Sequence, residues 1–98
     1  MRVVLTARAR ERLGEIEDFV AAASSPRAAE RMVERLLRAA RSLERFARRG
    51  RALPEAPGRE YRELIAGNFR IVYRLREDLV EVLTIFEGHR LLPPEEIE

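Results

Sequence analysis

The spacing of apolar residues changes once along the chain, and this change limits the folds that the sequence can adopt. Up to about residue 49, apolar residues recur every three or four positions, as Ala9, Leu13 and Ile16 do. After Gly58, apolar residues alternate with polar ones. The first period is typical of an amphipathic helix and the second of a half-buried strand. We therefore expect an α+β domain, with helices in the first half and strands in the second.

Two helices are expected before the change of period. Thr6 is a suitable N-cap for a helix over residues 7–23, and Ser25 for a second helix over residues 26–49. Gly50 is the expected C-terminal stop of the second helix. The short break between the two predicts an antiparallel helical hairpin.

Four strands are expected around this hairpin. The first opens the chain, and no other strand is expected before residue 55. The three later strands are separated by short turns and should form an antiparallel meander. The predicted ranges are 2–5, 59–65, 69–76 and 79–87. The predicted order is β-α-α-β-β-β, a single domain over residues 1–98 with the helical hairpin packed on one face of a mostly antiparallel four-stranded sheet.

All 19 basic residues are arginine, and their distribution along the chain is uneven. Residues 26–53 hold nine Arg and three Glu, a balance of +6, whereas the whole chain carries +2. Such a basic segment can attract an anionic partner. The absence of lysine and cysteine excludes Schiff-base, thiolate and disulfide chemistry. One histidine among scattered acids predicts no metal site, and we expect no cofactor, no membrane segment and a cytoplasmic location.

Several linked motifs resemble the RelE/ParE toxin family over nearly the whole chain. An opening strand leads into Thr6-Ala7-Arg8-Ala9, and a Leu53-Pro54 connector runs to Gly58. The most specific piece is Asn68-Phe69-Arg70-Ile71-Val72-Tyr73-Arg74, followed by a two-acid turn and an apolar strand that ends in Gly88-His89-Arg90. The resemblance implies the toxin of a type II toxin–antitoxin pair, with a role in plasmid stabilisation. It implies a cognate antitoxin as partner and a toxin–antitoxin hetero-oligomer.

The resemblance leaves open which of two cellular targets the toxin would act on. RelE-like members cleave messenger RNA on the ribosome, and the catalytic candidates here would be Arg70, His89 and Arg90. ParE-like members inhibit DNA gyrase and lack the nuclease residues. This sequence departs from the nuclease pattern because Ile65 falls where RelE carries a phosphate-binding arginine, there is no lysine, and no tyrosine follows His89.

We therefore interpret the chain as a ParE-like gyrase inhibitor rather than an enzyme. The alternative is a ribosome-dependent mRNA endoribonuclease, with the ribosome and mRNA as partners. A third reading is a degenerate toxin that only binds its antitoxin. The predicted partner-binding residues are Arg70, Arg74, Arg76 and Arg90. Arg70, Arg74 and Arg76 alternate on one strand and also admit a purely structural interpretation. In that interpretation they form a solvated face of the sheet and pair with Glu63 or Glu81.

Overall fold

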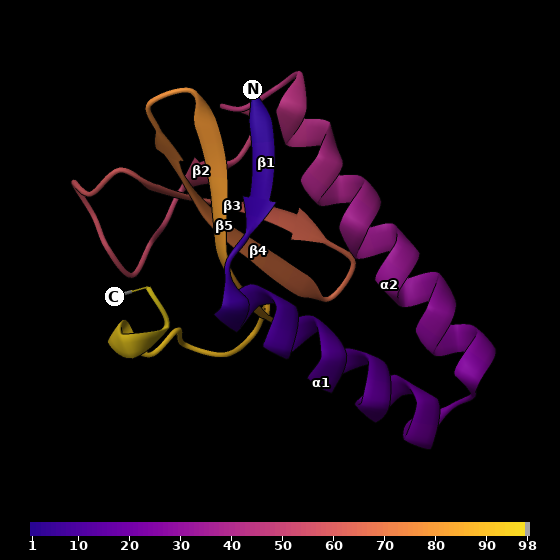
Figure 1. Cartoon of the computed structure of the whole chain (residues 1–98). Helices are drawn as coiled ribbons and strands as arrows, with labels where there is room; N and C mark the ends of the chain where they lie inside the picture. The colour runs from indigo at the N-terminus through magenta and orange to yellow at the C-terminus, as the bar shows by residue number, and fades with distance from the viewer. Residues whose placement is uncertain (98) are drawn as a thin grey trace.

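The computed structural model describes residues 1–97, in which two helices pack on one face of a five-stranded sheet (Figure 1). The helices are α1 (Ala7–Ala23) and α2 (Pro26–Arg41). The strands are β1 (Arg2–Leu5), β2 (Arg51–Ala52), β3 (Tyr61–Ala66), β4 (Phe69–Arg76) and β5 (Leu79–Glu87). Short 3₁₀ turns lie at Ser42–Glu44 and Pro94–Glu96. The predicted α+β class and β-α-α-β-β-β order are confirmed, although the sheet has five strands and not four.

The strand order across the sheet is β1-β5-β4-β3-β2. β1 runs parallel to β5 and every other pairing is antiparallel, as expected from a meander joined by the first strand. Thr6 fixes the passage from β1 to α1, because its hydroxyl accepts from the Ala9 amide and donates to the Leu83 carbonyl of β5. Within the described residues neither helix has the length and apolar character needed to cross a bilayer.

The fifth strand corrects the prediction that only the first strand precedes residue 55. Gly50 lies so close to the sheet that a Cβ there would be 2.6 Å from the Tyr73 hydroxyl and 2.7 Å from the Glu63 carbonyl. The Gly50 amide donates to that hydroxyl at 2.9 Å. Since this contact holds the chain against β3, the next two residues, Arg51 and Ala52, pair with Glu63 and Arg62.

The second helix is shorter than the predicted range 26–49. It ends at Arg41 and continues as a single 3₁₀ turn. The Ser42 hydroxyl donates to the Ala39 carbonyl at 2.6 Å, a local bond that competes with the helical ladder. The chain then turns so that Leu43 is fully buried and the Ala47 carbonyl accepts from the Tyr73 hydroxyl. Gly50 is therefore a close-packing position rather than the end of the helix.

Each face of the sheet has its own apolar cluster. The larger one lies under the helices, where Leu36 and Leu43 meet Ile71, Tyr73 and other strand residues. The second lies on the opposite face, where residues of the 53–58 connector and the C-terminal segment cover β3, β4 and β5; it comprises Leu53, Tyr61, Val72, Leu83, Phe86 and Leu92. The face of the sheet that holds Arg70 is thus partly covered by chain, which corrects the reading of it as a solvated face.

Candidate functional site

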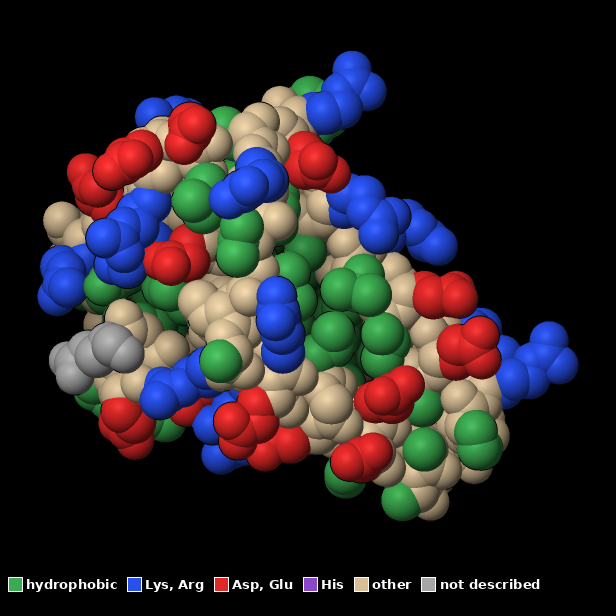
Figure 2. All heavy atoms as spheres, in the orientation of Figure 1, with side chains coloured by type: hydrophobic (Ala, Val, Ile, Leu, Met, Phe, Trp, Pro, Cys, Tyr) green, Lys and Arg blue, Asp and Glu red, His purple; other side chains and the backbone are tan. Residues whose placement is uncertain are grey.

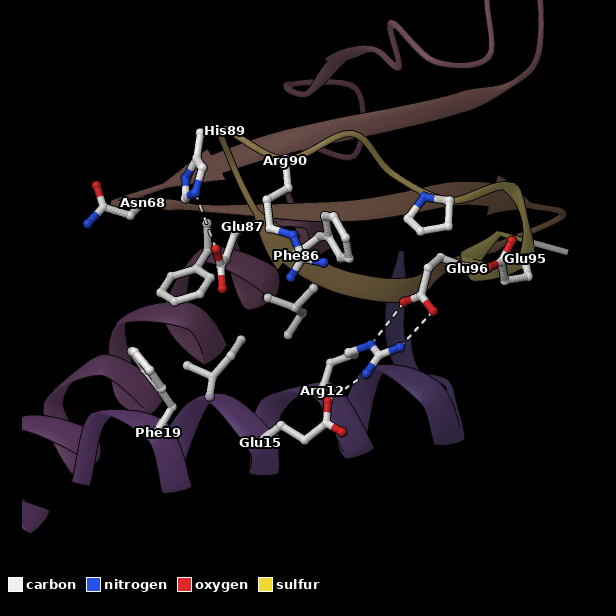
Figure 3. Close-up of a pocket in the computed structure, with 14 residues that line it drawn as sticks. Arg12, Glu15, Phe19, Asn68, Phe86, Glu87, His89, Arg90, Glu95 and Glu96 are labelled. Carbon is white, nitrogen blue, oxygen red and sulfur yellow. Dashed lines mark hydrogen bonds and ion pairs between the residues drawn. The ribbon is translucent and has the colours of Figure 1, made fainter. Parts of the chain in front are cut away.

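A groove of about 660 Å³ lies where α1, the adjoining ends of β4 and β5, and the C-terminal segment meet (Figure 3). Its apolar lining comes from Ile16 and Phe19 of α1, Phe69 of β4, and Ile85 and Phe86 of β5. Polar and charged residues complete the rim: Arg12, Glu15, Asn68, Glu87, His89, Arg90, Glu95 and Glu96. On the face shown in Figure 2, hydrophobic side chains gather between the sheet and the helices, with charged side chains around them.

An ion pair between α1 and the C-terminal segment closes one end of the groove. The Arg12 Nη2 atom lies 2.7 Å from Glu96 Oε2, and Nε lies 2.9 Å from Oε1. Glu96 is buried and also accepts from the Thr84 hydroxyl at 2.9 Å. The Arg12 hydrogen bonds lower the pKa of Glu96, although burial of the carboxyl acts in the opposite direction. Glu96 is therefore an anchor that holds the C-terminal segment on β5 and α1.

His89 and Arg90 lie at the other side of the groove and are both exposed. The His89 side chain is 79% exposed, and its Nε2 atom lies 3.4 Å from Glu87 Oε2. The Arg90 guanidinium lies 5.0 Å from the centre of the Phe86 ring, a cation–π distance. No ion pair joins Arg90 to a carboxylate within residues 1–97. The structure thus brings these two candidates together on an open rim, where they can contact a partner.

Arg70 lies in a different environment, buried among carboxylates between β4, β3 and the connector. Its Nε atom donates to Glu63 at 2.6 Å, while Nη1 and Nη2 donate to the two oxygens of Glu55 at 2.7 and 2.5 Å. Nη1 also donates to the Arg90 carbonyl at 3.0 Å. Four of the five N–H donors of a guanidinium are thus occupied. A phosphate could reach Arg70 only by displacing these partners.

Glu55, one of the two carboxylates around Arg70, is held in its charged form. Hydrogen bonding from Arg70 lowers the pKa of Glu55 to about 2, against the effect of burial, and the Leu92 amide contributes a further bond. Glu63 is fully buried and also pairs with Arg51 at 2.5 Å. This cluster links the connector, β2, β3 and β4 to the C-terminal segment. We call Arg70, Glu55, Glu63 and Arg51 the arginine–carboxylate cluster.

The other two predicted arginines of β4 lie at its far end. Arg74 pairs with Glu81 at 2.7 Å and its side chain is 31% exposed. Arg76 is more exposed and approaches Glu81 only to 3.9 Å. The pairing of these strand arginines with Glu63 and Glu81, one of the two sequence interpretations, is therefore present. Arg70, Arg74, Arg76 and Arg90 do not form one continuous cationic surface, and their predicted role in partner binding remains a prediction.

Sequence reasoning did not identify Glu55, Glu96 or Phe19 as parts of a site. The sequence places Glu55 in a loop and Glu96 in an acidic tail, two settings in which carboxylates are usually solvated. Phe19 stands out only after folding, because its side chain is 70% exposed beside an apolar groove. No group of three or more His, Cys, Asp or Glu side chains in residues 1–97 is arranged to hold a metal ion.

Comparison with known proteins gives a family match and several similar solved structures. A sequence model of the family described as "ParE toxin of type II toxin-antitoxin system, parDE" matches residues 3–92. A chain of the chromosomal ParDE toxin–antitoxin system from P. aeruginosa is similar with a TM-score of 0.78 and 21% identity, over 89% of this chain and 95% of that one. The toxin–antitoxin complex RelBE2 from Mycobacterium tuberculosis gives a TM-score of 0.49 and 20% identity, over 88% and 95%. No curated protein sequence matches the chain.

Proposed function

The chain belongs to the ParE toxin family of type II toxin–antitoxin systems, and from this membership we propose that it inhibits DNA gyrase by direct binding in the cytoplasm and is neutralised by a cognate antitoxin. Family membership is the basis for assigning the chain to the toxins of type II toxin–antitoxin systems. The choice of gyrase over the ribosome rests on the environment of the residues that a nuclease would use.

The choice of gyrase rests mainly on Arg70, because most of its guanidinium donors are already occupied by hydrogen bonds within the protein. A nuclease of the RelE type needs cations free to bind the scissile phosphate, together with a base and an acid. Arg70 is 5% exposed and already binds two carboxylates. Of the three catalytic candidates, only His89 and Arg90 remain open to solvent. Within residues 1–97, Arg12 at the rim is paired with Glu15 and Glu96, so Arg90 is the one rim arginine without a carboxylate partner. The rim therefore offers fewer free cations than a phosphoryl-transfer transition state requires.

The groove supports the second part of the proposal, binding of an antitoxin segment. Its apolar lining and charged rim suit an amphipathic helix or strand, which inserts apolar side chains and places acidic ones near the rim. Arg90 is the suitable contact for such an acid, because within residues 1–97 it has a ring and no carboxylate as neighbour. The similar ParDE structure comes from a toxin–antitoxin system, which agrees with such an occupant.

Two assays run side by side test the proposal. Purified protein is added to gyrase with relaxed plasmid, and separately to translating ribosomes with a defined mRNA. We expect loss of supercoiling in the first assay and intact mRNA in the second. Cleaved mRNA with unaffected supercoiling would favour the alternative, a ribosome-dependent endoribonuclease.

A further inference from the structure

The outer face of α2 carries a row of arginines that the proposed function does not use. Arg27, Arg31, Arg35, Arg38 and Arg41 follow one another at spacings of three or four residues, which places them along one side of the helix. We call these five residues the arginine stripe. All five are exposed, and Ala29, Leu36 and Ala40 are buried on the side that faces the sheet. In Figure 2, arginine side chains extend along the outer edge formed by α2, with acidic ones between them.

The five stripe arginines lack carboxylate partners within residues 1–97, in contrast to Arg12, Arg70 and Arg74. Within residues 1–97, arginines of α1, β2 and β4 form ion pairs, but none of the five stripe residues does. Glu30 and Glu34 belong to the same helix, yet neither is paired with an arginine in this part of the chain. The charge of the stripe is thus available to an external anion.

From this arrangement we propose that the stripe binds the phosphate backbone of duplex DNA without reading its sequence. From Arg27 to Arg41 the stripe extends about 21 Å at 1.5 Å per residue, and duplex DNA presents a phosphate charge about every 1.7 Å of its axis. Arginine is suited to phosphate because its planar fork can donate two hydrogen bonds. A base-specific role is not proposed, since no Asn or Gln lies on α2 to read adenine.

The composition of this face favours a duplex over other anionic partners. The stripe contains no aromatic residue on which unpaired bases could stack, as single-stranded nucleic acids require. It contains no apolar anchor of the kind that dominates protein–protein interfaces. α2 runs along an outer edge of the molecule (Figure 1), where a helix about 10–12 Å wide can approach the roughly 12 Å major groove of B-form DNA. The deep, narrow major groove of an RNA duplex does not admit a helix in this way.

Fluorescence anisotropy with a labelled DNA duplex of about 20 base pairs tests the inference without gyrase, so it can fail separately from the proposed function. The stripe variant is R31Q/R38Q, and R2Q/R10Q is a control with the same loss of charge on other exposed positions. We expect the stripe variant to bind at least about tenfold more weakly at 50 mM salt. The slope of log affinity against log salt should fall by about 2, roughly 1 for each lost phosphate contact. The control should stay within about twofold of the wild type.

Three results would overturn the inference. The first is absence of DNA binding by the wild type at 50 mM salt. The second is an equal loss of affinity in R31Q/R38Q and in the control, which would indicate a general charge effect. The third is equal or tighter binding of an RNA duplex of the same sequence, or of a polyglutamate peptide, which would assign the stripe to another partner. Circular dichroism at the assay temperature checks that both variants are folded.

Discussion

The guanidinium of Arg70 holds both carboxylate oxygens of Glu55, at 2.7 and 2.5 Å, and thereby ties the start of β4 to the connector that precedes β3. Glu63 completes the arrangement from β3, with its side chain fully buried. An arginine that the sequence presents as a binding residue is thus also part of the framework of the fold.

Replacing Arg70 should therefore destabilise the protein strongly. Within residues 1–97, Arg70→Gln leaves Glu63 with Arg51 as its one charged partner and deprives Glu55 of its ion pair. Removal of one member of a buried ion pair typically costs about 3–5 kcal/mol. Arg74→Gln, on the same strand but half-exposed, should cost at most about 1 kcal/mol. Urea denaturation measures both, and equal losses in the two variants would contradict the structural role of Arg70.

Acid should weaken the same cluster. The pKa of Glu55 is lowered from 4.5 to about 2 in the folded protein, chiefly by hydrogen bonding from Arg70. A depressed carboxyl pKa stabilises the folded state above about pH 4.5, and this contribution is lost as the pH falls towards 2. Its size is about 3 kcal/mol, since each pKa unit corresponds to about 1.4 kcal/mol.

Unfolding free energies at pH 7, 4.5 and 3 provide the measurement. Glu55→Gln should be less stable than the wild type at pH 7 and should lose less stability on acidification, because Gln does not titrate. A wild type and a variant with parallel pH profiles would show that Glu55 is not the titrating group.

The anchor at the C-terminus should be detectable by hydrogen exchange. Glu96→Gln removes the charge that pairs with Arg12, whereas Glu95→Gln alters an exposed neighbour as a matched control. We expect faster exchange of the Glu96 and Ile97 amides, which donate to Pro93 and Pro94 carbonyls, in the first variant only. Unchanged protection of these amides in Glu96→Gln would mean that apolar contacts alone hold the segment.

The groove should contribute affinity for the antitoxin rather than stability. Phe19→Ala removes a side chain that is 70% exposed, so the unfolding free energy should change by no more than about 0.5 kcal/mol. A buried aromatic anchor at an interface is worth about 2 kcal/mol or more, or roughly thirtyfold in affinity. Phe46→Ala is the control, because Phe46 is 58% exposed and lies outside the residues that line the groove.

Calorimetry with the antitoxin encoded by the neighbouring gene measures both variants. The wild type should bind, and saturating antitoxin should raise the thermal midpoint, by roughly 2.7 kcal/mol of added stability at 100 times the dissociation constant. A weaker Phe46→Ala complex beside an unaffected Phe19→Ala complex would place the interface elsewhere.

The comparison of sequence with structure shows which features follow from local pattern. The order of elements could be predicted because periodicity and caps such as Thr6 and Ser25 are local signals. Strand β2 could not, because it depends on the contact between Gly50 and the Tyr73 hydroxyl, 23 residues away. The end of α2 at Arg41 was missed because the Ser42 hydroxyl bond and the burial of Leu43 interrupt a helix whose apolar pattern continues in the sequence.

The candidate site was predictable only in part, for the same reason. His89 and Arg90 were identified by resemblance, and the structure places both on the rim of the groove. Of the two carboxylate partners of Arg70, Glu63 could be predicted from the sequence because it lies on the adjacent strand. Glu55 could not, because it belongs to the connector. The role of Glu96 depends on the C-terminal segment folding back across 84 residues of sequence to Arg12.

The most direct test of the gyrase proposal is to assay His89→Gln and Arg90→Ala beside the wild type, in plasmid supercoiling by gyrase and in mRNA cleavage on translating ribosomes. We predict that the wild type inhibits supercoiling and leaves mRNA intact. Arg90→Ala should weaken this inhibition, because an exposed cation at the groove rim is lost. His89→Gln should stay within about tenfold of the wild type, since a single hydrogen bond contributes about 0.5–1.5 kcal/mol. Ribosome-dependent cleavage by the wild type that falls by about 10²–10⁴-fold in His89→Gln, as for loss of a general acid or base, would contradict the proposal.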